Sequence, residues 1–430
     1  MKTPIPGPNS IKYKSISAQY ESHCLNLQAP IVWDRGEGVK VWDVDGNCFI
    51  DWTSGVLVTN VGHAHPKLAQ AIAEQARRLL NCYDFPTAER VTLAERMVKL
   101  APDNLDSAFF ATVGSEAVDA AVRVAKRFTD NFEIIAFYGG FHGRTLGTMS
   151  LAGKMGTKKK FGPVMPGVLH VPFPDPYRNP FGSESSDVAG QCLDFLETAV
   201  HAQSTGSIAA LIIEPYQGAA GFIFPPDGFL KAIETWCRDH DILFILDEVQ
   251  SSFGRTGKFL ALEWENLRPN MVCIGKGIGS GMPISCLLAE SNIMNSLGEG
   301  EMSSTWGGNP ICCAASHAIL DIFQEERLVE NAHTIGEYMK SRLFEMKEKC
   351  PYLGDVRGRG LVIGLDIVRN RKTKERDSKT TMKIITRCCE NGLIIGAVSG
   401  NVIRVAPPLV ITKEEADESL DIMEKVLMNI

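Results

Sequence analysis

Residues 108–128 of the chain read AFFATVGSEAVDAAVRVAKRF. The first six residues, AFFATV, form an apolar run with the length of a buried strand, and the residues after them change to a helical period. One helical stripe contains five apolar side chains, those of Ala117, Ala121, Val124, Ala125 and Phe128. A strand that passes directly into an amphipathic helix is typical of a βαβ unit, in which neighbouring strands run parallel.

Further apolar runs continue this alternation along the middle of the chain. They lie at residues 134–138, 209–213 (AALII), 242–246 (ILFIL) and 271–274. Continuous apolar runs, rather than alternating ones, are expected for strands that helices cover on both faces. The sequence therefore predicts an α/β fold with a large domain built on a mostly parallel sheet.

The two ends of the chain have a different pattern. Residues 360–368 (GLVIGLDIV) and 402–405 are predicted strands of a separate sheet, and a last helix is expected from Thr412, where Glu415 completes a capping box. Near the N-terminus, VWDVDGNCFIDW at 41–52 predicts two short strands around a tight turn. We expect an N-terminal segment, 1–60, that packs with a small α+β domain, 311–430, and a large domain at 61–310.

The composition argues against several classes of protein and partner. The chain has 44 Lys+Arg and 51 Asp+Glu, a formal charge of −7, which argues against a nucleic-acid or anionic membrane partner. No apolar run is long enough for a membrane helix, and the first ten residues lack the apolar segment of a secretory signal. The twelve cysteines contain no CxxC pair, which predicts reduced thiols in a cytoplasmic protein.

Distinctive polar groups follow the predicted strands. They are Gly114-Ser115, residues 139–144 (GGFHGR), Glu214, Asp247 and Lys276. Because ligands bind outside the carboxyl ends of the strands in open parallel sheets, we expect these groups to converge on one crevice.

Two of these groups have specific alternatives. Gly114-Ser115 is either an anion site at a helix N-terminus, most naturally for a phosphate, or a plain N-cap serine. Asp247 holds magnesium, as in a nucleoside triphosphatase, or faces a protonated pyridine nitrogen, or is simply an acidic residue at a strand end. The magnesium reading of Asp247 needs a GxxxxGK[ST] loop. Gly275-Lys276 continues with Gly277 instead, so the triphosphatase is excluded.

Charged side chains next to apolar strands also have two readings each. Lys276 is either a desolvated amine suited to Schiff-base chemistry or a surface lysine, and its flanking glycines suggest the close approach of a bulky group. Arg404 interrupts the apolar strand at 402–405 and needs a partner, which is either a substrate carboxylate or an internal acid. His63 and His65 have no third ligand at a recognisable spacing, so no metal site is predicted.

Six motifs in one order carry a family resemblance. They are GSEA (114–117), FHGRT (141–145), EPYQG (214–218), LDEVQ (246–250), GKG (275–277) and STWGGNP (304–310). Together they resemble the class-III aminotransferases, which are pyridoxal 5'-phosphate enzymes of fold type I, and the resemblance runs from VWDVDGNCFIDW to IRVAPPL. It implies a catalytic protein rather than a scaffold of the same fold.

The resemblance also implies roles around the cofactor. Lys276 looks like the lysine that forms the Schiff base and shuttles the proton, and Asp247 looks like the partner of the pyridine nitrogen. The other implied cofactor contacts are Gly114 and Ser115 at the phosphate, Thr305 reaching the phosphate from the other subunit, Phe141 stacking on the ring, His142, and Gln250 at the ring hydroxyl.

Four further residues resemble substrate contacts. Arg404 resembles the arginine that takes the α-carboxylate of a keto acid, and Glu214 the glutamate that pairs with this arginine when an ω-amine is bound. Arg144 matches the arginine that grips the distal carboxylate in bacterial 4-aminobutyrate aminotransferases. Val56 lies where the related dialkylglycine decarboxylases have glutamine, which argues against decarboxylation.

The implied function is transfer of an amino group from an ω-amino acid or amine, such as 4-aminobutyrate, to a keto acid such as 2-oxoglutarate. A homodimer with shared active sites, or a tetramer, is expected. Residues 171–182 (VPFPDPYRNPFG) and the tail IRVAPPLVI also resemble amino-acid racemases of the same class, although Arg144 replaces a small residue there. Two alternatives stay open: racemisation or epimerisation through Lys276, and a biosynthetic aminotransferase that acts on an amino sugar or aminocyclitol.

Overall fold

The computed structural model describes residues 1–25, 28–182 and 185–430. These residues form two compact units. Unit 1 contains Met1–Pro66, Gly254–Gly257 and Ile322–Ile430, and unit 2 contains Lys67–Phe253 and Lys258–Asp321. The boundary after Asp321 lies inside helix α12 (Pro310–Glu325), past the boundary that the sequence suggests near residue 310.

A seven-stranded sheet forms the centre of unit 2, in the order β4-β10-β9-β8-β7-β5-β6. Its strands are β4 (Ser107–Ala111), β5 (Glu133–Phe137), β6 (Val168–Val171), β7 (Ile208–Ile213), β8 (Leu243–Glu248), β9 (Met271–Ile274) and β10 (Ser285–Ala289). Only β10 pairs antiparallel, with β4 and β9, and the other pairs are parallel. Since β4 and β9 are both antiparallel to β10, the carboxyl ends of β4, β5, β7, β8 and β9 lie at one edge.

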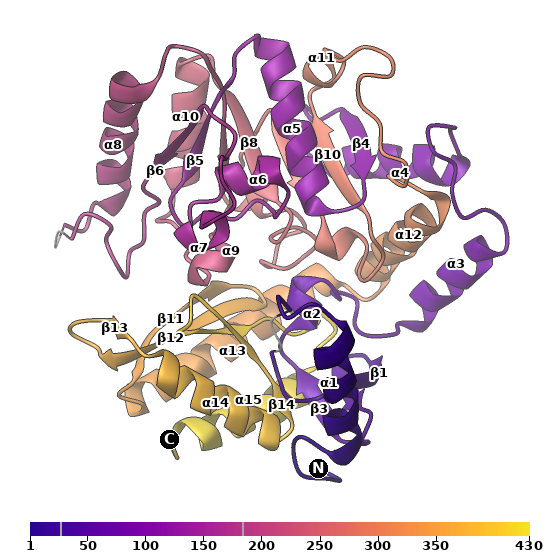
Figure 1. Cartoon of the computed structure of the whole chain (residues 1–430), viewed down its shortest axis with the longest axis vertical. Coiled ribbons are helices and arrows are strands. Elements are labelled where there is room, and N and C mark those ends of the chain that lie inside the picture. The colour runs from indigo at the N-terminus through magenta and orange to yellow at the C-terminus, as the bar shows by residue number, and fades with distance from the viewer. Residues whose placement is uncertain (26–27, 183–184) are drawn as a thin grey trace. The chain divides into compact units, whose positions relative to one another are not determined.

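The helices of this part of the chain are α3 (Pro66–Ala76), α4 (Ala88–Lys99), α5 (Gly114–Thr129), α6 (Leu146–Leu151), α7 (Met155–Lys158), α8 (Val188–Gln203), α9 (Gly218–Gly221), α10 (Phe229–Asp239), α11 (Ser291–Met294) and α12. Helices α4, α5, α6, α8 and α10 contact the strands of this sheet (Figure 1). Helix α5 crosses β4, β7, β9 and β10, and the residues of β7 and β8 are all buried, as their apolar runs predict.

Two details of the predicted elements were wrong. Phe128 does not join the buried stripe of α5, because it lies in the last turn, next to the left-handed C-cap Asp130, and 41% of it is exposed. The ends of several strands also differ: β4 ends at Ala111, whereas β8 extends through Glu248.

Unit 1 contains two smaller sheets. One has the order β1-β2-β3-β14, and the other has the order β11-β12-β16-β15 with β13 added at β12. The strands are β1 (Trp33–Glu37), β2 (Lys40–Asp43), β3 (Cys48–Asp51), β11 (Leu353–Arg359), β12 (Val362–Asn370), β13 (Glu375–Arg376), β14 (Leu393–Ile394), β15 (Gly396–Val398) and β16 (Val402–Val405). The parallel pairing of β3 with β14 joins the N-terminal segment to the C-terminal part of this unit.

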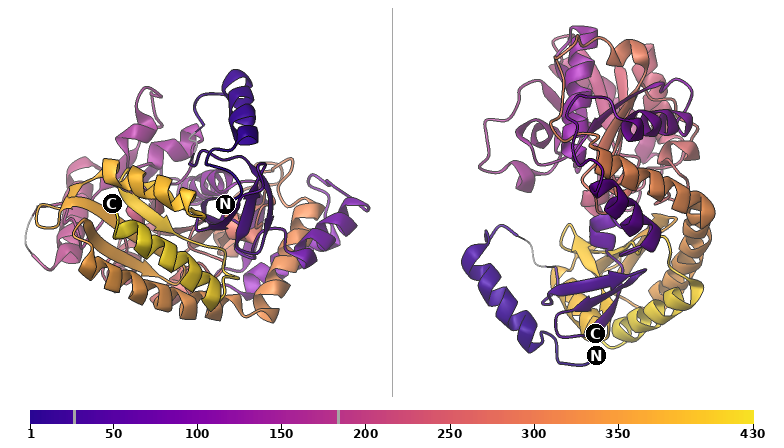
Figure 2. Two further views of the ribbon diagram at one scale, coloured as in Figure 1. Left: turned by 90° about the horizontal axis from the view of Figure 1, so that it is seen from below. Right: turned by 90° about the vertical axis from the view of Figure 1, so that its right-hand side faces the viewer.

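Five helices complete unit 1. They are α1 (Pro8–Tyr20), α2 (Ser54–Leu57), α13 (Leu328–Lys349), α14 (Ser378–Glu390) and α15 (Lys413–Leu427). Thr412 caps α15, and Glu415 completes the predicted capping box. Both views of Figure 2 show α1 standing away from the strands of its unit. None of the helices in the described ranges has the length and apolar character needed to cross a membrane.

Candidate active site

The structure brings the predicted polar groups of unit 2 to one edge of its sheet. Gly114 and Ser115 begin α5 just after β4, and Glu214 directly follows β7. Asp247 is the second-last residue of strand β8, and Lys276 follows β9 after one glycine. Since these strand ends point the same way, the groups lie along one edge of the sheet. Their convergence on one crevice stays a prediction.

A buried histidine fixes the carboxylate of Asp247. His142 Nδ1 lies 2.7 Å from Asp247 Oδ2, and the Val249 N–H donates to Oδ1 at 3.1 Å. Burial alone lowers the pKa of His142, but the hydrogen bond and charge of Asp247 outweigh it and raise the pKa above its ordinary value. His142, in the loop after β5, and the Val249 N–H therefore hold the two oxygens of Asp247 in one orientation.

Glu214 ties two loops together at the same edge. Its Oε1 accepts a hydrogen bond from the Phe141 N–H at 2.9 Å, and its Oε2 accepts one from the Gly218 N–H at 3.1 Å. Burial raises the pKa of Glu214 to about 7, against the opposing positive charge of His142. This carboxyl group therefore changes its charge near neutral pH.

The raised pKa of Glu214 predicts a pH-dependent stability. Because the folded-state pKa lies above the ordinary 4.5, the contribution of Glu214 is fully present below about pH 4.5 and is lost as the pH rises through about 7. The change is on the order of 3 kcal/mol. Urea unfolding at a series of pH values between 4.5 and 8 should show that the free energy of unfolding falls less with rising pH for Glu214→Gln than for the wild type. Exposed Glu345 provides the control Glu345→Gln, and parallel curves for all three proteins would contradict the assignment.

The N-terminus of α5 is open at this edge. Its N-cap residue, Val113, provides no side-chain cap, and Glu116 instead accepts from the N–H and hydroxyl of Thr112 at 2.8 and 2.5 Å. A Cβ at Gly143 would overlap Ser115 Oγ, so glycine is needed for the FHGRT loop to approach Ser115. An uncapped helix N-terminus beside a hydroxyl group is suited to a phosphate.

The side chain of Val249 explains why positions 114 and 275 are glycines. A Cβ at Gly114 would lie 2.6 Å from Val249 Cγ1, and one at Gly275 would lie 3.1 Å from the same atom. At Gly275 the group that approaches closely is therefore a side chain of the chain itself. Lys276, the next residue, is half-buried and has φ +47°, a strained backbone conformation of the kind that clusters at functional sites.

These groups fit the pyridoxal phosphate that the motifs imply. Gln250 Oε1 is buried without a hydrogen-bond partner among the described residues, and a Cβ at Gly218 would overlap it. This acceptor could only be satisfied by a bound group or a water. The fixed carboxylate of Asp247 suits a protonated ring nitrogen, the Gln250 amide suits a ring hydroxyl, and the start of α5 suits the phosphate.

Phe141 and Arg144 occupy the loop after β5. Phe141 is half-buried, and the exposed Arg144 has its Cζ 5.8 Å from the centroid of the Phe141 ring. Thr305 is exposed in unit 2, and its neighbour Ser303 lies with its Oγ 3.4 Å from the hydroxyl of Tyr83. The reach of Thr305 into a second subunit stays a prediction.

Unit 1 carries the two remaining predicted site residues. Arg404, in β16, is 6% exposed and donates from Nη2 to Gln28 Oε1 at 2.7 Å. Its Nε is buried without a partner in the described part of the chain. Burial lowers the pKa of Arg404, and the charge of Asp51 opposes the shift. Val56, with φ +68°, lines a cavity of about 240 Å³ together with Gln28 and Trp33.

The sequence reasoning missed two residues at these positions. Val249 packs against Gly114 and Gly275, and its only signal was an apolar side chain inside the polar run LDEVQ. Gln28 holds Arg404 over a separation of 376 residues, and no local pattern indicates that contact.

His63 and His65 bind separate carboxylates in unit 1. His63 Nε2 lies 2.9 Å from Asp51 Oδ2, and His65 Nε2 lies 2.9 Å from Glu326 Oε1. No cluster of three His, Cys, Asp or Glu side chains suited to a metal ion occurs within residues 1–25, 28–182 and 185–430.

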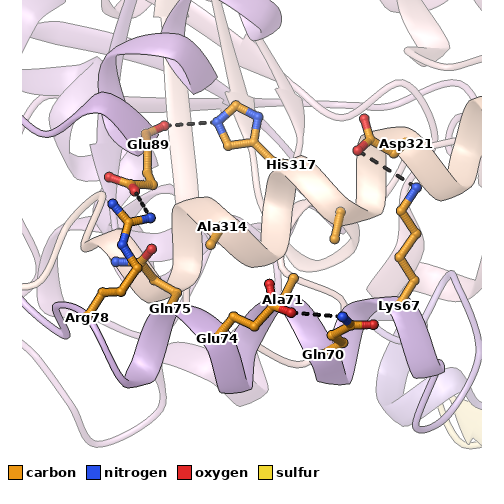
Figure 3. Close-up of a pocket in the computed structure, with 11 residues that line it drawn as sticks. Lys67, Gln70, Ala71, Glu74, Gln75, Arg78, Glu89, Ala314, His317 and Asp321 are labelled. Atoms are coloured by element: carbon orange, nitrogen blue, oxygen red, sulfur yellow. Dashed lines mark hydrogen bonds and ion pairs between the residues drawn. The ribbon is translucent and has the colours of Figure 1, made fainter.

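Unit 2 contains a cavity of about 480 Å³ between α3, α4 and α12 (Figure 3). Four of its charged groups form ion pairs: Arg78 Nη1 lies 3.1 Å from Glu89 Oε1, and Lys67 Nζ lies 3.8 Å from Asp321 Oδ2. None of the predicted site residues lines this cavity, so we do not assign it as the active site.

Comparison with known proteins agrees with this arrangement. The family described as Aminotransferase class-III matches residues 24–427. The chain is 40% identical to an alanine/serine racemase of Pyrococcus horikoshii, over 93% of this chain and 86% of that protein. It is 34% identical to a probable 4-aminobutyrate aminotransferase of Bacillus subtilis, over 91% of each. An amine transaminase from an uncultivated Pseudomonas species, in its PLP-bound form, superposes with a TM-score of 0.90 at 28% identity, covering 95% of this chain and 98% of that one.

An α/β unit with these groups at the carboxyl edge of its sheet defines a pyridoxal-phosphate enzyme of fold type I. The chain belongs to the class-III aminotransferases. The predicted family, fold class, cofactor and enzyme class are thereby confirmed. Membership of this family implies an amino donor and a keto-acid acceptor as substrates.

Proposed function

We propose that this enzyme transfers the amino group of an ω-amino acid or amine, such as 4-aminobutyrate, to a 2-keto acid such as 2-oxoglutarate. The observation that carries the choice of donor is the position of Arg144, whose Cζ lies 5.8 Å from the centre of the Phe141 ring. A guanidinium group there is suited to bind the far carboxylate of an ω-amino acid bidentately. Arg404 is proposed to bind the α-carboxylate of the keto acid.

Each residue at the sheet edge has a proposed part in the reaction. Lys276 holds the cofactor covalently between turnovers and moves the proton to and from the substrate carbon that bears the amino group. Asp247, held by His142, keeps a positive charge on the ring nitrogen. When bound, pyridoxal phosphate supplies an electron sink for the charge left on that carbon. Gly114 and Ser115 bind the phosphate, and Gln250 binds the ring hydroxyl.

Racemisation is the second candidate function, and the 40% identity with an alanine/serine racemase favours it. It would use the same proton removal by Lys276 but return the proton to the same carbon, without a keto-acid acceptor. Incubating the enzyme with one enantiomer of alanine, with and without 2-oxoglutarate, separates the two reactions. Transamination predicts glutamate formation that depends on the acceptor. Loss of chirality without the acceptor would overturn the proposal in favour of racemisation.

Arg144→Ala tests the choice of donor. We expect KM for 4-aminobutyrate to rise by roughly 10- to 100-fold, because a charge-assisted hydrogen bond contributes about 1.5–3 kcal/mol. KM for an amine without a carboxylate should stay within about twofold of the wild-type value. Arg238→Ala, at a residue on α10 with an exposed side chain, is the matched control. Equal losses for both donors would show that Arg144 does not bind the distal carboxylate.

The exposed apolar side chains near Thr305 support a homodimer with shared active sites. Phe85 and Trp306 are 76% and 65% exposed, and the Tyr83–Ser303 contact joins their two segments. Exposed aromatic side chains in one region mark interaction sites. Light scattering should give a dimer mass for the wild type and a lower mass for Trp306→Glu. The control Met382→Glu alters an exposed residue of unit 1, and a wild type that is monomeric would contradict the proposal.

The thiols support a cytoplasmic location for the enzyme. All twelve cysteines are free, and most are buried. Free thiols persist in a reducing compartment.

A further inference from the structure

Gln28 accepts a hydrogen bond from the guanidinium group of Arg404. The Gln28 Oε1 accepts from Arg404 Nη2 at 2.7 Å, while the buried Nε–H on the same edge of the guanidinium has no partner in the described part of the chain. That edge, with two parallel N–H groups, is one to which a carboxylate binds bidentately. The neutral amide therefore satisfies one of the two donors that a carboxylate could satisfy together.

The surroundings are built for this contact. A Cβ at Gly396 would lie 2.5 Å from Arg404 Nη2 and 2.8 Å from Gln28 Oε1, so the missing side chain of Gly396 provides the space that the pair occupies. Gln28 also lines the cavity of about 240 Å³, together with Trp33, Thr53 and Val56. The same glutamine thus contacts the buried cation and forms part of the wall of a ligand-sized space.

We propose that Gln28 is a specificity-determining residue that competes with the substrate carboxylate for Arg404. A carboxylate displaces the amide because it engages both Nε–H and Nη2–H and carries a full charge. A neutral ligand group gains nothing over Gln28 and leaves the pair in place. The inference rests on the proposed role of Arg404 as the carboxylate-binding residue. It adds that Gln28 lowers the affinity of Arg404 for a substrate carboxylate.

Equilibrium binding of glutarate tests this competition. Glutarate has two carboxylates but no amino or keto group, so isothermal calorimetry on the holoenzyme measures binding without turnover. Gln28→Ala should tighten glutarate binding by about tenfold, since one hydrogen bond no longer has to be broken. Gln28→Glu should weaken it by at least about tenfold, because the new carboxylate pairs with Arg404 itself.

Gln19, exposed in α1 of the same unit, provides matched controls. Gln19→Ala and Gln19→Glu repeat the truncation and the charge change, and both should bind glutarate like the wild type. Unchanged binding in both Gln28 variants, or weaker binding in Gln28→Ala, overturns the inference.

Arg404→Gln separates this inference from the function on which it rests. If this variant loses glutarate binding while the Gln28 variants do not change it, only the role of Gln28 fails. If Arg404→Gln binds glutarate like the wild type, the proposed role of Arg404 fails, and the role of Gln28 fails with it. Thermal unfolding of each variant checks that the fold is retained.

Discussion

Lys276→Ala is expected to lower the turnover number by at least about 10³-fold, because it removes the proposed proton-transfer group. The same change removes the amine through which the cofactor is expected to attach. Wild-type protein should be yellow, and after borohydride reduction, mass spectrometry should find the cofactor fixed to the peptide that contains Lys276. The variant should show neither the covalent attachment nor more than trace activity.

The fold should survive this substitution. Lys276 is half-buried between two glycines, and its side chain is not part of the apolar core. Circular dichroism of Lys276→Ala should therefore match the wild type, and the unfolding temperatures of the two proteins should agree closely once both are freed of cofactor. Lys99→Ala, at an exposed lysine of α4, is the control for loss of a positive charge. Turnover within tenfold of the wild type would refute the central role of Lys276.

Asp247→Asn is expected to lower the turnover number by at least about 100-fold, since it replaces the fixed negative charge proposed to face the ring nitrogen with a neutral amide. In the wild type the Val249 N–H donates to one carboxylate oxygen of Asp247, and His142 Nδ1 lies within hydrogen-bond distance of the other. The substitution places an amide N–H₂ group against one of these two partners. We expect weaker retention of the cofactor as well, measured from the absorbance of dialysed protein.

His142 provides a readout of this change that does not depend on activity. The charge of Asp247 raises the pKa of His142 against the effect of burial. Without that charge burial prevails, so the pKa of His142 should fall below its ordinary value in Asp247→Asn. An NMR titration of the histidine ring follows this shift. Asp239→Asn, at an exposed residue of α10, should leave the titration unchanged. An unchanged pKa of His142 in Asp247→Asn would mean that the charge of Asp247 does not raise that pKa.

The sheet of unit 2 could be predicted because each of its central strands is marked by a short run of neighbouring residues in the sequence. A strand covered on both faces must be apolar throughout, so β7, β8 and β9 stand out as runs such as AALII and ILFIL. The direction rule for parallel sheets then places whatever follows each run at one edge. Phe128 was misplaced because a helical stripe does not indicate where the helix passes beyond the strands it covers.

The sequence by itself determined the class of fold and the identity of the groups that follow the strands at one edge of the sheet, because hydrophobic period and short motifs are properties of neighbouring residues. Only the tertiary structure decided which side chains touch: His142 meets Asp247 across 105 residues, and Gln28 meets Arg404 across 376. Val249 likewise fills the space beside Gly114 and Gly275. Such contacts depend on how separate elements pack, and no local pattern records the distance between two side chains that the folded chain brings together.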